Sequence, residues 1–266
     1  MNPPVVLRLD DVGAASKRNE IYTDVSWGIG RLRFKANWIP GLKYRPGYAK
    51  WGPYGEMSGA DWHKILQVLQ ASGARMTVAV TAAWVEDDAS LTPFVEKFPD
   101  EAAALKGGVE SGVIEIANHG LTHCVMADGA FRPRRFSSNR TYHREFWEWI
   151  PAETQREHIA RSQDLLQGWL GADVVTLVPP GNVFSDATLA AAEAHGLQYM
   201  SCNTPGGQLG ELWSVGTESV RAFHDRDIVL HGHEWLTALI DEQPESCRWL
   251  TVAELAAEQL TVSASP

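Results

Sequence analysis

Short apolar runs rich in β-branched residues alternate along this chain with segments of helical periodicity. The predicted strands cover residues 5–9, 76–81, 113–117, 174–178, 197–201, 220–223 and 228–230. The predicted helices cover residues 58–72, 91–105 (interrupted at Pro99), 152–170, 185–195 and 251–260. Strands that alternate with helices form a largely parallel sheet. About seven of them favour a closed or partly closed barrel, so we expect an α/β fold in a single domain over residues 1–266.

The charge and cysteine content exclude several classes of protein. A net charge of −10 argues against nucleic-acid or anionic-membrane partners. No stretch approaches the roughly 20 apolar residues of a membrane span, and the N-terminus lacks the pattern of a signal peptide. Cys124, Cys202 and Cys247 are odd in number and far apart, which favours a reducing compartment. We therefore expect a cytoplasmic protein, and its oligomeric state stays open.

Two long connections, residues 12–57 and 124–150, follow predicted strands that end in polar residues. Loops of this length usually carry function, so we expect both at one rim of the barrel. The chain has 11 tryptophans, several in these polar segments, and flat aromatic rings suit sugars as well as ordinary packing. We interpret the loops as substrate walls; the alternative is a packed lid or a dimer contact.

Three strand-like runs end in residues that bind metals or move protons. They are followed by Asp10-Asp11, by His119-x-x-x-His123 and by His231. Alone, an Asp pair is also a turn signal, and a single histidine is more often part of the core. Together, two histidines and a carboxylate form a standard set for a divalent metal with open positions. A second carboxylate and a third histidine remain for acid and base chemistry, which points to metal-assisted hydrolysis.

The order of these motifs resembles the polysaccharide deacetylases with the NodB homology domain, carbohydrate esterase family 4. The matching stretches are Arg8-Leu9-Asp10-Asp11-Val12-Gly13, His119-Gly120-Leu121-Thr122-His123 and Ile228-Val229-Leu230-His231. The resemblance spans residues 5 to about 235 and implies a NodB-like distorted barrel. It departs at Leu177-Val178-Pro179-Pro180-Gly181-Asn182, where Leu177 stands at the place of the arginine that orients the family's base. Arg8 and Asn182 are candidate substitutes.

The resemblance also implies a role for each residue. Asp11, His119 and His123 would hold one divalent metal, usually Zn²⁺, Asp10 would be the general base, and His231 the general acid. A backbone N–H near Pro180, Gly181 and Asn182 is a candidate to hold the oxyanion. The candidate aromatic contacts to a sugar are Trp51, Tyr54 and Trp235.

The function predicted from the sequence is removal of an acetyl group from an N-acetylated sugar. Divergent relatives resemble enzymes of cell-surface polysaccharide or lipopolysaccharide biosynthesis. One alternative keeps the barrel and cleaves another C–N bond in a small molecule. A further alternative, from a different class, is an inactive sugar-binding module, against which all five site residues argue.

Overall fold

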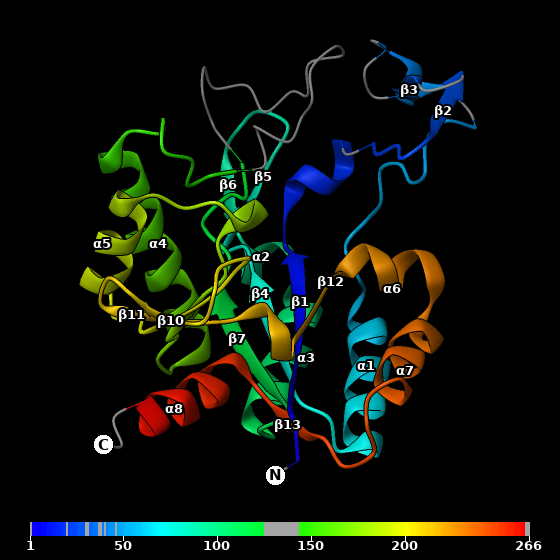
Figure 1. Ribbon diagram of the computed structural model, residues 1–266. Helices are drawn as coiled ribbons and strands as arrows, with labels where there is room; N and C mark the ends of the chain where they lie inside the picture. Colours follow the sequence, from blue (N-terminus) through cyan, green and yellow to red (C-terminus); the bar gives the residue numbers. More distant parts are fainter. Residues whose placement is uncertain are drawn as a thin grey trace.

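A sheet of mainly parallel strands forms the centre of the computed structural model, which describes residues 2–19, 21–29, 32–36, 39, 41–45, 47–124 and 144–263 (Figure 1). Its order is β10-β11-β9-β8-β7-β4-β1-β12, and β13 pairs with the first half of β1. Within this sheet, β10 and β11 are the only described strands that pair antiparallel. These strands are β1 (Pro4–Val12), β4 (Met76–Val80), β7 (Ile114–Asn118), β8 (Thr176–Leu177), β9 (Tyr199–Ser201), β10 (Gly207–Leu209), β11 (Leu212–Val215), β12 (Val220–His224) and β13 (Arg248–Leu250).

The sheet curls into an incomplete barrel, as one hydrogen bond demonstrates. Arg8 of β1 donates from its guanidinium to Ser201 Oγ of β9 at 3.0 Å, although β4, β7 and β8 lie between these strands. In a flat sheet the two strands would be about 19 Å apart, at about 4.8 Å per strand. Because one arginine spans the gap, the sheet must be strongly curved. Among the described residues no pairing joins β10 to β12, so the barrel is open, and the predicted distorted α/β barrel is confirmed.

Helices cover the outside and one end of the sheet. In Figure 1, α4 and α5 lie on one side, α1 and α7 on the other, and α8 lies near the N-terminus. The helices of the described chain are α1 (Gly59–Ser72), α2 (Phe94–Lys97), α3 (Pro99–Glu110), α4 (Ala152–Leu170), α5 (Asp186–Ala194), α6 (Asp225–His231), α7 (His233–Asp241) and α8 (Val252–Ser263). None of them is long and apolar enough to cross a membrane.

The two faces of β1 have different surroundings. Leu7 and Leu9 are fully buried in the main core, which also contains Trp62 and Ile65 of α1. Arg8 and Asp10 alternate with these leucines, and side chains alternate between the two faces of a strand. They therefore lie inside the curl, where they are 3% and 4% exposed. The apolar face of β1 packs against the helices, and the polar inner face presents Arg8 and Asp10 to the interior of the barrel.

Several helix boundaries follow the predicted sequence signals. Ser58 caps α1 in a capping box with Asp61, and Gly73 ends it at φ 67°; a positive φ of this kind favours glycine. Ser185 caps α5, and Gly171 ends α4. The helix predicted over residues 91–105 is wrong in part. It splits into strand β6 (Leu91–Pro93), α2 and α3, because Pro99 cannot continue α2 and instead starts α3.

The strand predicted at residues 228–230 is wrong, because this stretch lies within α6. A run of three apolar residues fits either state, and periodicity alone does not separate them. The helix begins at Asp225, where Asp227 accepts a hydrogen bond from the His224 N–H at 2.9 Å. His231 therefore ends a helix, and its side chain is exposed.

The first predicted rim loop contains regular structure of its own. Strands β2 (Ser26–Ile29) and β3 (Leu32–Lys35) form an antiparallel hairpin that projects beyond the end of β1 (Figure 1). A second hairpin joins β5 (Ala83–Val85) to β6. Within the second rim loop, residues 125–143 lie outside the described residues, and so does Trp38 of the first. The rest of the second loop, residues 144–150, packs against the candidate site.

Candidate metal centre

A β-bulge in β1 places the Asp pair. Leu9 pairs with Val78, whereas Val12 pairs with Val80, so β1 has one more residue than β4 over this interval. Asp11 accordingly has φ 73°, in the left-handed region that residues other than glycine seldom adopt. A bulge re-aims the side chain that it carries. Asp10 therefore stays inside the curl, whereas Asp11 points to the carboxyl end of the sheet.

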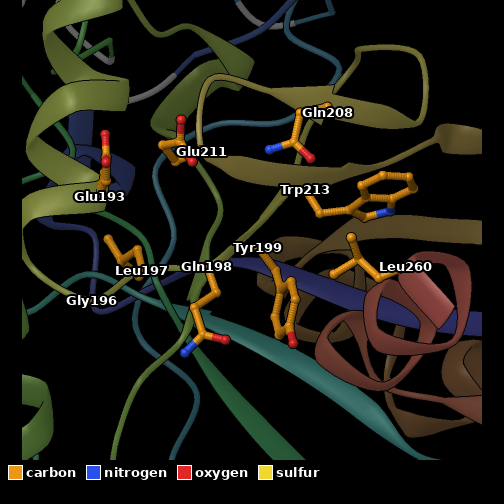
Figure 2. A pocket seen from close by; sticks show the side chains of 9 residues that line it. All are labelled: Glu193, Gly196, Leu197, Gln198, Tyr199, Gln208, Glu211, Trp213 and Leu260. Carbon is orange, nitrogen blue, oxygen red and sulfur yellow. The ribbon is translucent and has the colours of Figure 1, made fainter. Parts of the chain in front are cut away.

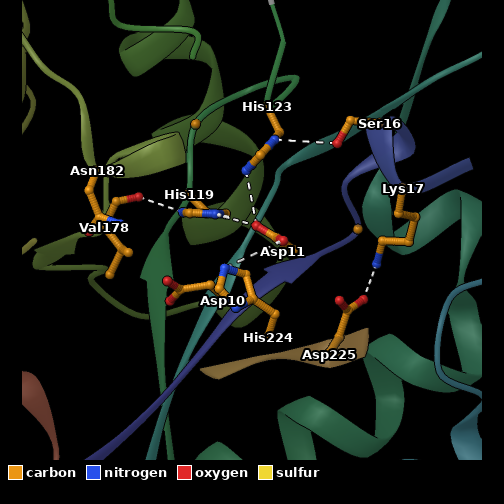
Figure 3. A network of polar contacts seen from close by, with 12 residues as sticks. Asp10, Asp11, Ser16, Lys17, His119, His123, Val178, Asn182, His224 and Asp225 are labelled. Atoms are coloured by element: carbon orange, nitrogen blue, oxygen red, sulfur yellow. Dashed lines mark hydrogen bonds and ion pairs between the residues drawn. The ribbon is translucent and has the colours of Figure 1, made fainter. Parts of the chain in front are cut away.

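Asp11, His119 and His123 meet at this end of the sheet (Figure 3). Asp11 Oδ1 lies 3.4 Å from His119 Nε2 and 3.1 Å from His123 Nε2, and the three donor atoms lie within 4.8 Å of one another. Burial would raise the pKa of Asp11, but His224 and His123 together with hydrogen bonds from His119 and His123 hold it well below its usual range. Two imidazole nitrogens and one carboxylate oxygen are donors that fit Zn²⁺ or a similar ion.

His119 is oriented by a hydrogen bond from its other ring nitrogen. His119 Nδ1 lies 2.6 Å from the Val178 carbonyl oxygen at the end of β8. A carbonyl can only accept, so the proton of the neutral ring lies on Nδ1 and Nε2 keeps its lone pair. Metal-binding histidines usually have such a partner. This contact fixes the tautomer that an ion beside Asp11 requires.

The loop between the two histidines is held by a buried carboxylate that the sequence did not reveal. Glu145 accepts hydrogen bonds from the backbone N–H groups of Leu121, Thr122 and His123 at 2.9–3.2 Å. His158 of α4 lies 2.5 Å from its Oε1. Burial would raise the pKa of Glu145, but His158 and these N–H groups lower it. Glu145 thus fixes the backbone that presents His123, whose φ is 56°.

Asn118 performs the same task at the start of this loop. Its Oδ1 accepts from the Gly120 N–H at 2.8 Å, and its side-chain amide donates to Ser162 and Gln163 of α4. Gly120 has φ 80°, and a Cβ there would lie 2.2 Å from Glu145 Oε2. Only glycine fits between the backbone of this loop and the Glu145 carboxylate that clamps it.

The candidate base, Asp10, is bound by a neighbouring arginine. Arg8 Nε donates to Asp10 Oδ1 at 2.9 Å, and a second guanidinium nitrogen donates to Oδ2 at 2.7 Å. Arg8 also reaches Asn182 Oδ1 at 3.4 Å. A bidentate pair of this kind fixes the plane of the carboxylate. Leu177 is buried with Phe146 and Ile159 in a separate apolar cluster, so its position does not face Asp10, and Arg8 provides the guanidinium instead.

A different histidine from the predicted one lies at the metal centre. His224 ends β12, directly beside Asp10 in the register of β1 and β12, and its Nε2 lies 4.0 Å from Asp11 Oδ2. His231 lies seven residues later along the chain, at the exposed end of α6. The polar contacts of Asp11 among described residues come from His119, His123, His224 and Arg226. The predicted placement of His231 at the site is therefore wrong.

The predicted substrate residues divide into two groups. Pro180, Gly181 and Asn182 follow β8 at the carboxyl end of the sheet, and Trp51 and Tyr54 lie beside the residues that follow β12. Trp235 lies elsewhere, on α7, where it packs against Phe223 at a ring distance of 5.2 Å. The structure brings the first five residues toward the metal centre and places Trp235 against the core.

A buried charged cluster supports the strand end next to His224. Lys17 forms ion pairs with Asp225 and with Glu56, the latter at 2.7 Å, and Tyr54 donates to Asp225 at 2.9 Å. One lysine faces two carboxylates, so the cluster carries an excess negative charge when both are ionised. Burial and the neighbouring Glu56 raise the pKa of Asp225 to about 7, although Lys17 opposes this.

A surface pocket on another part of the sheet has a different character (Figure 2). Its volume is about 370 Å³, and its lining includes Gln198, Tyr199 and Trp213. Gln198 and Tyr199 lie at the amino end of β9. The Asp11 cluster lies at the opposite, carboxyl end of the sheet, where α/β proteins usually bind ligands. This pocket is therefore separate from the candidate site.

Comparison with known proteins agrees with the geometry. The sequence profile of the polysaccharide deacetylase family matches residues 52–200, more than half of the chain. The chain belongs to the polysaccharide deacetylase family. No curated protein sequence matches it.

Solved structures align with the chain at low identity. A Mycobacterium smegmatis protein assigned to the polysaccharide deacetylases aligns at a TM-score of 0.55 and 12% identity, covering 100% of this chain and 93% of that one. A family 4 acetyl xylan esterase from Clostridium thermocellum, in complex with a cobalt ion, aligns at a TM-score of 0.47 and 13% identity, covering 80% of this chain and 89% of that one. A 4-α-glucanotransferase from Thermococcus litoralis aligns at a TM-score of 0.49 and 13% identity. The alignment covers 75% of this chain and only 37% of that one. The likeness to the Mycobacterium smegmatis protein concerns the fold alone.

The charge imbalance at Asp225 leads to a prediction on stability and pH. A carboxyl group whose pKa rises from 3.8 to about 7 on folding binds its proton more tightly in the native state. Its contribution to stability is therefore full below about pH 4 and is lost as the pH rises through about 7. We expect Asp225→Asn to remove this part of the pH dependence, leaving Lys17 paired with Glu56. Urea unfolding at pH 5 and pH 8 measures it, and the exposed Asp173→Asn is the control. An unchanged difference between the two pH values in Asp225→Asn would contradict the assignment.

The clamp on the histidine loop leads to a second prediction. Glu145→Ala leaves three backbone N–H groups and His158 without their acceptor, so we expect a loss of about 3–5 kcal/mol in the free energy of unfolding. Because the loop then holds His123 less firmly, zinc affinity should fall by about 10- to 100-fold. Denaturant unfolding and a zinc competition titration measure the two effects. His158→Ala, which keeps the three N–H bonds, should lose less of both, and equal zinc affinity in Glu145→Ala and wild type would rule out the clamp.

Proposed function

We propose that this protein is a metal-dependent hydrolase that removes an acetyl group from an N-acetylated sugar. Membership in the polysaccharide deacetylase family supports deacetylation of a carbohydrate. The observation that carries the proposal is the Asp11–His119–His123 cluster, with Asp10 and His224 on neighbouring strands beside it. A metal site, a carboxylate and a histidine in this arrangement are the components of metal-assisted hydrolysis.

We propose Zn²⁺ as the ion, held by Asp11, His119 and His123. The donor set and the orienting contact of His119 with the Val178 carbonyl support this choice. When bound, the ion supplies Lewis acidity, which polarises an acetyl carbonyl and makes water nucleophilic near neutral pH.

Asp10 is the proposed general base. Arg8 occupies one hydrogen-bonding direction of each carboxylate oxygen, and an ionised carboxylate has further lone pairs that can take a proton from water. Arg8 also prevents rotation of the carboxylate, so the remaining lone pairs keep a fixed direction.

His224 is the proposed donor to the departing nitrogen, in place of His231. Arg226 donates to His224 Nδ1 at 2.9 Å, and an arginine cannot accept, so the neutral ring has its proton on Nε2. Nε2 is the atom that faces Asp11. To protonate the departing nitrogen, the ring must be an imidazolium, whose Nε2–H would point toward the place where the acetyl group is cleaved, and transfer of that proton returns the ring to its neutral form. The backbone N–H of Gly181 is the proposed hydrogen-bond donor to the oxyanion, since Pro180 has no N–H and the Asn182 N–H donates to the Pro179 carbonyl at 2.9 Å.

We also propose a cytoplasmic location. The three cysteines form no disulfide, and Cys124 and Cys202 are buried. Burial raises the pKa of both buried thiols, so they stay protonated and unreactive. This use of cysteine supports a reducing compartment.

The metal site gives the first test of the function. We expect the purified protein to bind about one equivalent of zinc, and Asp11→Ala and His119→Ala to lose it. Asp10→Asn should keep the metal and lose most acetate release, because Asp10 is not among the three ligands. Metal content by mass spectrometry measures this, with the exposed His63→Ala as control. A wild-type protein that binds no divalent metal after reconstitution would exclude the proposed mechanism.

The two candidate histidines give a matched pair of variants. We expect His224→Asn to lower acetate release from N-acetylated oligosaccharides by about 100- to 10,000-fold, as for loss of a general acid. His231→Asn should retain the wild-type rate, because that side chain is exposed at the end of α6. Steady-state rates at equal metal content compare them. A large loss of rate in His231→Asn with a wild-type rate in His224→Asn would assign the general acid to His231 instead of His224.

The guanidinium of Arg8 gives a third test. Arg8→Met leaves Asp10 buried without its partner, so we expect a loss of about 3–5 kcal/mol in the free energy of unfolding. The double variant Arg8→Met/Asp10→Asn should recover much of this stability, because no unpaired charge remains. Arg8→Lys should fold but turn over slowly, since lysine cannot form the bidentate pair. Denaturant unfolding and the pH–rate profile measure these effects, and an Arg8→Lys profile identical to wild type would contradict a positioning role.

A further inference from the structure

A positively charged side chain lies beside the candidate metal centre. Arg226 follows His224 by two residues and is 19% exposed. One guanidinium nitrogen lies 2.9 Å from His224 Nδ1, and another lies 3.8 Å from Asp11 Oδ2. No carboxylate in the described part of the chain accepts a hydrogen bond from Arg226. The cation is therefore close to the reacting centre and only weakly neutralised.

This position is electrostatically unfavourable for a protein that holds a divalent cation. Once an ion takes up the charge of Asp11, Arg226 faces a site of its own sign at short range. Like charges at such distances destabilise each other unless an anion lies between or beside them. Among the described residues, Asp11 is the only carboxylate within 4.0 Å of the Arg226 guanidinium, so an anionic ligand would supply the negative charge that the bound ion takes from Asp11.

Aromatic stacking holds Arg226 in place and connects it to the first rim loop. The guanidinium carbon lies 4.8 Å from the centre of the Trp51 ring. Trp51 stacks on Tyr22 with ring centres 5.5 Å apart, and Tyr22 and Trp51 also pair through their backbones. These two residues close the base of the segment that includes the β2–β3 hairpin. Trp51 therefore joins the metal centre to this hairpin.

The segment above Trp51 has a charge opposite to that of the chain. Residues 26–50 contain six Lys and Arg and no Asp or Glu, within a chain of net charge −10. Arg33, Lys35 and Arg45 are exposed, and within the described residues they pair with no carboxylate. Trp27 and Phe34 stack on the hairpin at 6.4 Å. The hairpin projects past the carboxyl end of β1 (Figure 1), on the same side of the sheet as Asp11.

We propose that the substrate is an acidic carbohydrate. An anionic group next to the acetylated sugar binds the Arg226 guanidinium over Trp51, and further acidic units lie along the basic hairpin. This inference rests on the proposed deacetylase function and adds the charge of the substrate to it. Arginine suits this task because its planar fork matches carboxylate and phosphate groups while it stacks on an aromatic ring. Sugar rings can contact the exposed aromatic faces of the same segment.

The test compares two ligands that differ only in charge. One is an oligosaccharide of alternating glucuronic acid and N-acetylglucosamine, and the other is the same oligosaccharide with its carboxyl groups reduced to alcohols. Binding is measured by calorimetry on zinc-loaded Asp10→Asn protein, which prevents turnover. We expect the charged ligand to bind at least about 10-fold more tightly, with a preference that weakens as salt increases. Equal binding of the two ligands, together with equal binding of a neutral and a phosphate-bearing N-acetylated sugar, would overturn the proposal.

Variants test which residues produce the preference for the charged ligand. Arg226→Gln should remove most of it, and Arg156→Gln, which removes one exposed positive charge on α4, should keep it. The double variant Arg33→Gln/Lys35→Gln should weaken binding of an eight-sugar ligand and leave a disaccharide unaffected, because only the longer chain reaches the hairpin. A preference that survives Arg226→Gln would overturn the assignment of this residue.

The remaining outcomes separate this inference from the proposed function and identify the anion. Acetate release by the wild type from the neutral ligand at the same rate as from the charged one supports deacetylation and overturns the acidic substrate. Carboxylate-dependent binding without acetate release from any ligand supports the acidic ligand and overturns the deacetylase function. Arg226-dependent binding of a nucleotide-linked N-acetylhexosamine, but not of the uronic acid ligand, supports the anion site with phosphate as its group. Tighter binding of a single-stranded oligonucleotide of equal charge would overturn the proposal in favour of nucleic acid.

Discussion

The single extra residue in β1 is the constraint on which the site depends. Without the bulge between Leu9 and Val12, Asp10 and Asp11 would continue the simple alternation of the strand. The bulge keeps Asp10 beside Arg8 within the curl and turns Asp11 to the rim, where it meets His119 and His123. One local irregularity thus gives two adjacent carboxylates different surroundings, which allows one to bind a metal while the other moves a proton.

Three buried charged groups surround this constraint, and each one fixes a different part of the site. Arg8 holds Asp10, Glu145 with His158 holds the histidine loop, and Lys17 holds the start of α6 through Asp225. Buried ion pairs contribute little net stability compared with apolar packing, but the loss of one partner is costly. Their value here lies in position, because each charge has its low-energy state in only one arrangement of the loops.

The sequence predicts that Asp11, His119 and His123 lie together, because Asp11 and His119 follow strong strand signals and the carboxyl ends of parallel strands meet at one edge. It predicts His224 poorly for an instructive reason. The sequence predicts the strand over residues 220–223, which His224 follows directly, but the more apolar run at 228–230 fits the family motif better. The clamp by Glu145 has no local signal, since it depends on a contact between two loops separated by 22 residues. Leu177 takes the place of the family's arginine in the sequence motif, but its side chain packs in a separate apolar cluster with Phe146 and Ile159. The motif alone does not reveal this direction of the side chain.

Backbone strain is concentrated where the chemistry is proposed. Four non-glycine residues in the described chain have positive φ, and three of them, Asp11, His123 and Asn182, lie at the metal centre or in the loop beside it. Such conformations cost of order 1–3 kcal/mol each and persist only where neighbouring contacts impose them. Asp11 is imposed by the bulge, His123 by Glu145, and Asn182 lies within reach of Arg8. The protein therefore spends packing and hydrogen-bond energy to hold Asp11 and His123 in one geometry, as the proposed metal site requires of its ligands.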